Sequence, residues 1–143
     1  MLEKARLFPF HALHCLNIEQ PLGIPPNSFD AVVCVGVMDF VALPKAFLEQ
    51  VARILRPEGV FGVTLPERRR RAEAAGGSAQ DRQENGATGL SENDELSSFD
   101  WTEADDLVAS AGFHIHRRER FLGYVDSETG AETHYYGYLL RLG

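Results

Sequence analysis

The sequence predicts an α/β fold built on parallel strands, and three observations carry that prediction. An apolar run over residues 30–37 is followed by an amphipathic stretch over 43–55 and a second apolar run over 60–65. The first run is rich in valine and lacks polar alternation, which is typical of a parallel strand buried on both faces. Pro57 and Gly59 end the amphipathic stretch. Two parallel strands joined through a helix predict a right-handed crossover with helices packed on the sheet.

The segments before this unit are shorter. Residues 1–6 are good helix formers and are expected to be the end of a helix, which Pro9 limits. Residues 12–18 form a short apolar run that predicts a strand. Residues 21–28 are rich in proline and predict a turn region.

The C-terminal third predicts a helix followed by a long hairpin. Thr102 is the expected N-cap of the helix, and Gly112 is the residue expected just after its end. Residues 113–121 and 133–142 predict two strands, with the turn of the hairpin at 127–130.

Composition limits the classes of function. A chain of 143 residues that is 44% apolar and 24% charged predicts one globular domain, spanning residues 1–143. A net charge of −7 repels polyphosphate, so no nucleic-acid partner is expected. No apolar run has the roughly 18 residues of a membrane helix, and the first residues lack the apolar core of a secretory signal. Cys15 and Cys34 favour free thiols in a reducing cytoplasm, although the sequence leaves a bridge between them open.

One segment differs sharply from the rest. Residues 67–98 contain only two large apolar side chains, Leu90 and Leu96, and predict a flexible polar excursion from the domain. Four arginines at 68–71 could bind phosphate, but in an acidic chain they favour a solvated run.

Four phrases carry a family resemblance, in order and with matching spacing. They are PPNSFDAVVCVGV, FLEQVARILRPEGVFGVT, TEADDLVASAGF and THYYGYLLRL. Together they resemble the later half of class I S-adenosylmethionine-dependent methyltransferases. The last phrase is similar to a small methyltransferase-like group first noted for the Williams–Beuren chromosomal region. The resemblance implies a partial Rossmann-like methyltransferase sheet, mostly parallel with a C-terminal antiparallel hairpin, and S-adenosylmethionine as cofactor.

The register of the resemblance implies a truncated domain. The family order of strands is 3-2-1-4-5-7-6, in which residues 12–18 correspond to strand 3 and residues 30–37 to strand 4. The first two strands and the glycine-rich cofactor loop have no counterpart, and the chain contains no GxGxxG motif. Strand 4 then exposes an apolar edge, which invites a protein partner or self-association. Alternatively, strand 3 docks directly on strand 4.

The resemblance also implies site residues. Asn17 falls where the family has an aspartate that binds adenine, and Ile18 beside it corresponds to a residue flanking the ring. Val35 and Gly36 lie at the carboxyl end of a strand, where open α/β sheets bind ligands. Asp39 is a weak candidate for a general base. Each has a structural alternative: a strand-end polar residue, a core residue, a relief of crowding, or a helix cap.

Other polar residues are expected to be structural. Tyr135 and Tyr136 predict strand packing rather than substrate stacking. The pairs His11 with His14 and His114 with His116 lack a third ligand, so no metal site is expected.

Two functions follow from this reading. The first is methyl transfer from S-adenosylmethionine to a small-molecule oxygen or nitrogen nucleophile, by a domain of which this chain is a fragment inactive alone. The alternative is a non-catalytic interaction module, or one half of a split enzyme, that pairs with a partner through its exposed sheet edge. The fragment hypothesis predicts that the chain alone does not bind S-adenosylmethionine measurably.

Overall fold

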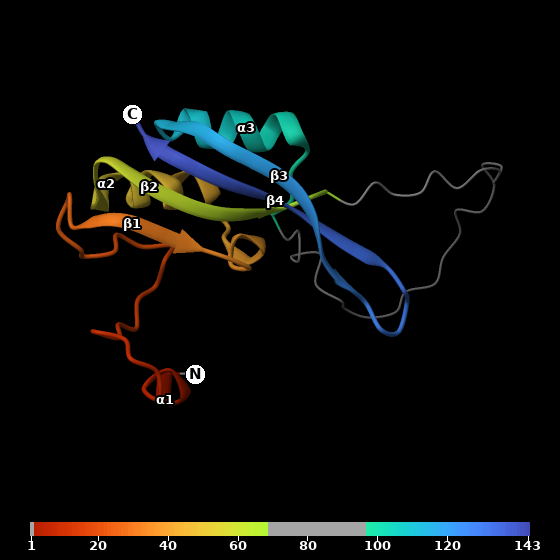
Figure 1. Ribbon diagram of the computed structural model, residues 1–143, viewed down its shortest axis with the longest axis horizontal. Helices are drawn as coiled ribbons and strands as arrows, with labels where there is room; N and C mark the ends of the chain where they lie inside the picture. The colour runs from red at the N-terminus through yellow and green to blue at the C-terminus, as the bar shows by residue number, and fades with distance from the viewer. Residues whose placement is uncertain (1, 69–96) are drawn as a thin grey trace, which may run out of the picture.

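The computed structural model describes residues 2–68 and 97–143 (Figure 1). The elements in chain order are α1 (Leu2–Ala5), β1 (Phe29–Cys34), the 3₁₀ turn η1 (Met38–Phe40), α2 (Pro44–Ile54), β2 (Leu55–Pro66), α3 (Trp101–Ser110), β3 (Phe113–Val125) and β4 (Glu132–Leu142). The four strands form one sheet in the order β1-β2-β4-β3.

Strand directions confirm the predicted α/β fold class. β1 pairs with β2 in parallel, while β4 is antiparallel to both β2 and β3. Consequently β1, β2 and β3 run in one direction, and β4 returns as the second arm of a C-terminal hairpin. The predicted turn at 127–130 closes this hairpin, where the Asp126 amide donates to the Ala131 carbonyl at 2.9 Å.

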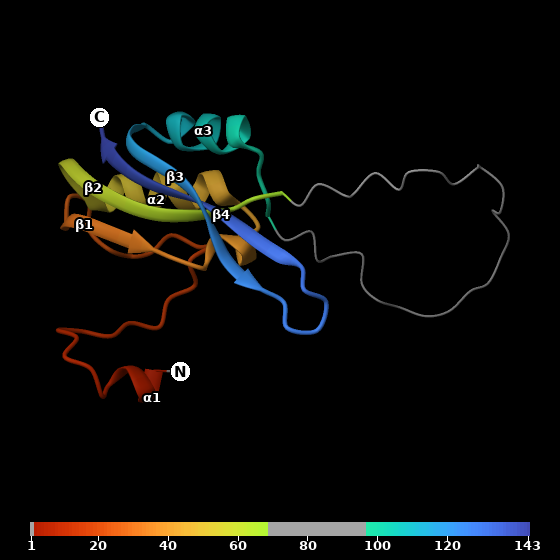
Figure 2. The same cartoon turned by 45° about the vertical axis from the view of Figure 1, so that its right-hand side comes forward.

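Helices α2 and α3 cover one face of the sheet (Figures 1 and 2). Their apolar side chains form one core with alternate residues of the two central strands. The helix residues are Phe47, Leu48, Val51, Ala104 and Val108, and the strand residues are Phe61, Val63, Leu65, Tyr136, Tyr138 and Leu140. Alternation in a strand sends the intervening side chains to the other face. That second face carries Val33, Gly62, Phe121, Gly137 and Leu139 and is called the open face below.

One predicted strand is absent, because residues 12–18 have no regular structure. β1 is the edge strand of the sheet, and no described segment pairs with its free side. A single strand gains no ladder hydrogen bonds without a neighbour, so strand-like composition alone does not order residues 12–18. The segment therefore does not dock directly on β1.

Several boundaries also differ from expectation. β2 begins at Leu55 rather than at residue 60, and β3 continues to Val125 rather than ending at residue 121. β1 ends at Cys34 rather than at residue 37, because Gly36 adopts a φ of +67° that leaves the strand conformation. α3 is capped by Asp100 and not by Thr102. The Asp100 carboxylate accepts from the Glu103 amide at 2.9 Å, and the Glu103 carboxylate accepts from the Asp100 amide at 2.9 Å. This reciprocal capping box satisfies donors at the start of the helix.

The segment that follows β2 and the segment that precedes α3 lie side by side and are hydrogen-bonded to each other. Beyond β2, the amide of Arg68 donates to the Phe99 carbonyl at 2.8 Å, and the Phe99 amide donates to the Pro66 carbonyl at 3.0 Å. Ser97 then donates its hydroxyl to the Val41 carbonyl at 2.7 Å. The predicted polar excursion falls almost entirely on residues 69–96, which lie outside the described residues.

Candidate active site

The carboxyl ends of β1 and β2 lie at the same edge of the sheet, because the two strands are parallel. In open α/β sheets, ligands bind at this edge. Val35 and Gly36 follow β1 directly, and both are exposed. The Gly36 amide donates to the Thr64 hydroxyl of β2 at 3.0 Å, which holds the two strand ends together.

Gly36 is required by backbone conformation rather than by crowding. A Cβ at this position would meet no atom within 4 Å, so the glycine does not relieve a close contact among the described residues. Its φ of +67° is a conformation that L-residues with a branched side chain adopt only with strain. The open space next to its backbone leaves room for a ligand.

Asn17 and Ile18 lie in a turn that packs against the segment following η1. The Asn17 side chain accepts from the Glu19 amide at 3.0 Å, and Glu19 in turn accepts from the Ala42 amide at 2.8 Å. Ile18 is half-buried against the core. The turn is therefore joined to the segment that follows Asp39 in the chain, although Asn17 uses its side-chain oxygen locally.

Asp39 lies in η1, immediately after the β1 end. The Tyr135 hydroxyl donates to its carboxylate at 3.2 Å, and the Tyr135 ring stacks on Phe121 with centroids 6.1 Å apart. Asp39 does not cap η1, since Val37 is the N-cap residue and has no side-chain cap bond. Tyr135 thus contacts a predicted site residue as well as packing within the sheet.

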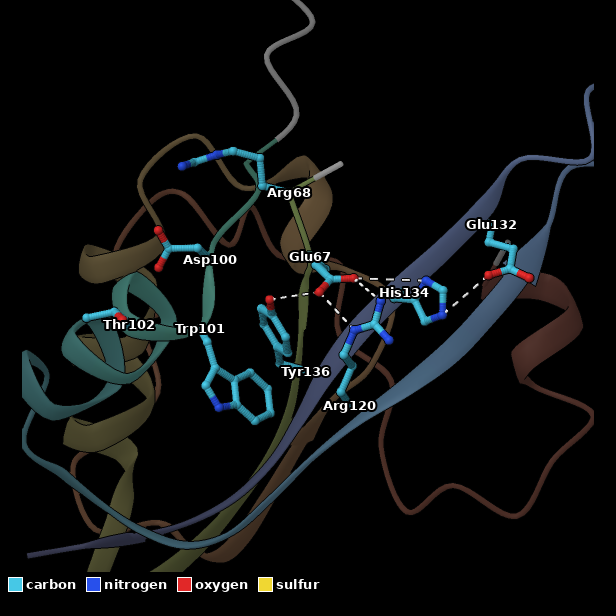
Figure 3. Close-up of a pocket in the computed structure, with 9 residues that line it drawn as sticks. All are labelled: Glu67, Arg68, Asp100, Trp101, Thr102, Arg120, Glu132, His134 and Tyr136. Carbon is cyan, nitrogen blue, oxygen red and sulfur yellow. Dashed lines mark hydrogen bonds and ion pairs between the residues drawn. The ribbon is translucent and has the colours of Figure 1, made fainter. Parts of the chain in front are cut away.

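A cavity of about 940 Å³ opens at the same edge, beyond the N-terminus of α3 (Figure 3). Its centre is the Glu67 carboxylate, which directly follows β2. Arg120 of β3 donates to both carboxylate oxygens at 2.8 Å, and the Tyr136 hydroxyl of β4 donates to one of them at 3.0 Å. His134 approaches the other oxygen at 3.9 Å. These four residues are called the Glu67 cluster.

Hydrogen bonding sets the charge state of the Glu67 cluster. The Arg120 guanidinium is the main cause of a lowered pKa for Glu67, and the Tyr136 hydroxyl adds to it against the opposing effect of burial. Glu67 is therefore an ionised carboxylate and a weak base. Burial, followed by the hydrogen bond to Glu67, raises the pKa of Tyr136 to about 12, so this phenol stays protonated.

His134 lies between two carboxylates. Its Nδ1 faces Glu67 and its Nε2 is 3.6 Å from the Glu132 carboxylate. His134, Glu67 and Glu132 thus line one side of the cavity with polar groups.

Trp101 forms the apolar wall of the cavity. Its ring contacts the Tyr136 ring with centroids 4.2 Å apart, and the Arg118 guanidinium lies 4.8 Å from the centroid of its ring. At the mouth, Arg68 forms an ion pair with Glu103 at 2.8 Å. The cavity thus combines an aromatic surface with charged groups that pair with one another, as Arg120 does with Glu67.

Sequence reasoning did not identify the Glu67 cluster. Glu67 lies in the predicted polar excursion, Arg120 and His134 fall within the two predicted strands, and Tyr136 is expected to pack within its strand. The signal that could have located them is the hairpin register. Arg120 lies opposite Tyr136 and Leu122 lies opposite His134, so the period-2 pattern places these polar residues on one face.

The described residues offer neither a metal site nor a membrane-spanning helix. Among residues 2–68 and 97–143, no group of three or more His, Cys, Asp or Glu side chains is arranged to hold a metal ion. Within the same residues, no helix has the length and hydropathy needed to span a bilayer.

Comparison with known proteins places these features in a family context. Residues 1–63 match the family described as "Methyltransferase domain". Over 52 residues the chain is 35% identical to a ubiquinone biosynthesis O-methyltransferase of Neisseria meningitidis. The aligned residues make up 36% of this chain and 22% of that enzyme. The chain therefore spans about a fifth of this relative.

Solved structures share the fold at low identity. The [4+2]-cyclase SpnF has a TM-score of 0.62 at 18% identity, covering 90% of this chain and 56% of that one. An S-adenosylmethionine-dependent methyltransferase from Mesorhizobium loti has a TM-score of 0.63 at 17% identity, and the match covers 99% of this chain and 75% of that one. At this identity the likenesses show a shared fold, and the match to a methyltransferase domain covers residues 1–63, less than half of the chain.

Proposed function

We propose that this chain forms the acceptor side of an S-adenosylmethionine-dependent methyltransferase that acts on a small molecule. The observation that carries the proposal is the position of the Glu67 cavity, which opens at the same sheet edge as the exposed Val35 and Gly36. A cofactor at the β1 end and an acceptor at the β2 end would then be neighbours. Methyl transfer depends mainly on such proximity and in-line orientation.

The residues divide into two groups in this proposal. Val35, Gly36 and the turn holding Asn17 and Ile18 would contact the cofactor. His134 and the Glu67 carboxylate would bind the acceptor's hydroxyl or amine, and Asp39 remains a candidate base. Fold alone does not settle the reaction, because a similar structure is a cyclase.

We further propose that the glycine-rich cofactor turn comes from polypeptide outside these 143 residues. The chain has no GxGxxG motif, and backbone amides at such a turn are the usual anchor of a nucleotide-type cofactor. A cytoplasmic location is part of this proposal, since Cys15 and Cys34 are both free thiols.

The test compares two proteins by calorimetric titration with S-adenosylmethionine. One is the 143-residue chain, and the other is the chain extended by whatever coding sequence lies in frame upstream. The expected result is no measurable binding to the first and a micromolar dissociation constant for the second. A micromolar constant for the chain alone contradicts the fragment proposal. An extended chain that contains a glycine-rich turn and still does not bind contradicts the cofactor assignment.

A second candidate function is favoured by the β1 edge. β1 is the edge strand of the sheet, and no described segment pairs with its free side. Val33 of β1 is 74% exposed, and Val35, which follows the strand, is 64% exposed. Such an edge can accept a strand from another polypeptide, which is the interaction-module alternative. Cooperative urea unfolding of the isolated chain, without any cofactor binding by the extended chain, would favour this function over catalysis.

A further inference from the structure

The segment that follows β1, residues 35–39, is held by side chains of two other strands. The Gly36 amide donates to the Thr64 hydroxyl of β2 at 3.0 Å. Three residues further on, the Asp39 carboxylate accepts from the Tyr135 hydroxyl of β4 at 3.2 Å. The partners lie 28 and 96 positions apart in the sequence, so the position of this segment depends on the assembled sheet.

The hairpin is built to hold the Tyr135 ring in one place on the open face. Phe121 lies directly opposite Tyr135, and the two rings stack with an interplanar angle of 24°. A Cβ at Gly123 would lie 2.5 Å from two atoms of the Tyr135 ring, and a Cβ at Gly137 would lie 3.2 Å from the Phe121 ring. Each strand of the hairpin therefore supplies one glycine and one aromatic ring that covers the glycine of the other strand. Such diagonal contacts across a strand pair are within reach of aromatic side chains.

Tyr135 supplies a restraint on η1 that burial does not. Met38 and Val41 are almost fully buried, which fixes how deeply η1 is seated in the core. The Asp39 side chain lies between them in the chain, and its hydrogen bond to Tyr135 is the one it makes within residues 2–68 and 97–143. The bond therefore restrains the solvent-facing side of η1 relative to β4.

We propose that Tyr135, together with Thr64, is a positioning residue for S-adenosylmethionine and acts by fixing residues 35–39. This inference rests on the proposed function, in which Val35 and Gly36 contact the cofactor. Gly36 has open space beside its backbone, so a ligand can approach a segment whose position is already set. Fixing a binding segment in advance lowers the entropy that binding must overcome. Neither positioning side chain has to touch the cofactor.

Tyr138 provides a matched control on the same strand. Its hydroxyl donates to the Asp105 carboxylate of α3 at 2.8 Å, which is also a tyrosine–aspartate hydrogen bond. Its side chain lies in the core on the helix-covered face of the sheet. Tyr138→Phe therefore deletes the same chemical group as Tyr135→Phe without removing a bond to residues 35–39.

The first experiment is calorimetric titration of the upstream-extended chain with S-adenosylmethionine. Tyr135→Phe should raise the dissociation constant about tenfold, since it removes a hydrogen bond to a charged group. Thr64→Val keeps the shape of the side chain but removes the acceptor of the Gly36 amide, and it should also weaken binding. Tyr138→Phe should bind within about twofold of the wild type, because it acts at a separate contact.

A double-mutant cycle shows whether Tyr135 acts through Asp39. Asp39→Ala should weaken binding by about the same factor as Tyr135→Phe, and the double variant should be no weaker than either, because all three lack the same bond. Asp39→Asn should bind more tightly than Asp39→Ala, since an amide oxygen can accept the Tyr135 hydroxyl. A general loosening of the hairpin would not give this recovery.

The second experiment needs no cofactor and uses the 143-residue chain. The Phe40 amide donates to the Val37 carbonyl at 3.0 Å within η1, and its hydrogen exchange reports the order of this turn. Tyr135→Phe should make this exchange about tenfold faster, whereas Tyr138→Phe should leave it unchanged.

Three results overturn the inference. One is equal affinity of the wild type and Tyr135→Phe for S-adenosylmethionine, and another is equal exchange of the Phe40 amide in these two proteins. The third is a double variant whose loss is the sum of the two single losses. A wild-type extended chain that does not bind S-adenosylmethionine contradicts the proposed function instead, and hydrogen exchange then still decides whether Tyr135 holds residues 35–39.

Discussion

The Tyr136 hydroxyl makes one of the three hydrogen bonds that hold the Glu67 carboxylate, and its removal is a sharp test of the cluster. Tyr136→Phe keeps the ring against Trp101 and deletes only the donor at 3.0 Å from Glu67. A hydrogen bond to an ionised group contributes about 1.5–3 kcal/mol. We expect the free energy of unfolding to fall by about 2 kcal/mol at pH 7.

The pKa of Glu67 determines how the cost of the substitution changes with pH. The lowered pKa of Glu67 means that the folded state favours the carboxylate. Its stabilisation is therefore present above the unfolded pKa, about 4.3, and is lost as the pH falls through the folded pKa. The cost of Tyr136→Phe should shrink in the same acidic range, because protonated Glu67 is a weaker acceptor.

At alkaline pH, the stability of the wild type changes because of the Tyr136 phenol itself. Tyr136 keeps its proton in the folded state up to about pH 12, whereas an unfolded tyrosine ionises near 10. Wild-type stability should therefore fall by up to roughly 3 kcal/mol from this group between those values. The phenylalanine variant lacks this loss, so the difference between the two proteins should nearly vanish by pH 12. Tyr138, whose pKa is also raised to about 12, contributes equally to both proteins.

The assay is urea unfolding followed by fluorescence of Trp101, the only tryptophan in the chain. Tyr124→Phe is the control, since Tyr124 is 54% exposed and its loss should cost less than about 0.5 kcal/mol. A cost below about 0.5 kcal/mol for Tyr136→Phe at pH 7 would refute the reasoning. So would a cost that is the same at pH 7 and pH 11.

Three further predictions use the same unfolding measurement or a thiol assay. Gly36→Val should cost about 2 kcal/mol because of the φ of +67°, whereas Gly36→Asn should retain most of the stability; equal effects would contradict a backbone cause. Asp100→Ala should cost about 1–2 kcal/mol through loss of the capping box, and a loss under about 0.3 kcal/mol would show that the cap is not stabilising. In the native protein, exposed Cys15 should react rapidly with Ellman's reagent, while Cys34, whose pKa is raised by burial, should react only on unfolding; equal rates would contradict the burial of Cys34.

Local sequence signals located most of the fold. The helix predicted over 43–55 is found at Pro44–Ile54, with a proline in its first turn. The second strand is longer than its apolar core: it begins at Leu55, opposite Phe29 of β1, and its pairing with β4 continues to Pro66. In both cases hydrophobic period and chain-breaking residues are properties of the segment itself, so the sequence is enough to find them.

Features that depend on distant partners were harder to predict. Residues 12–18 have the composition of a strand, yet a strand forms only where a neighbour exists. Glu67 gains its role from Arg120 and Tyr136, which are more than 50 positions away and meet it only through the hairpin register. Thr102 and Asp100 are both good caps, and the reciprocal bond to Glu103 decides between them.

The backbone bonds between Pro66, Arg68 and Phe99 have a consequence for how this domain can vary. They fasten both ends of the intervening stretch to the sheet, so its length does not influence the register of β2 with β4. Lengthening a closed loop costs only about 0.6 kcal/mol per doubling. The junction at Arg68 and Ser97 is therefore a natural place for insertions, deletions or a grafted peptide, with little effect on the four-stranded scaffold.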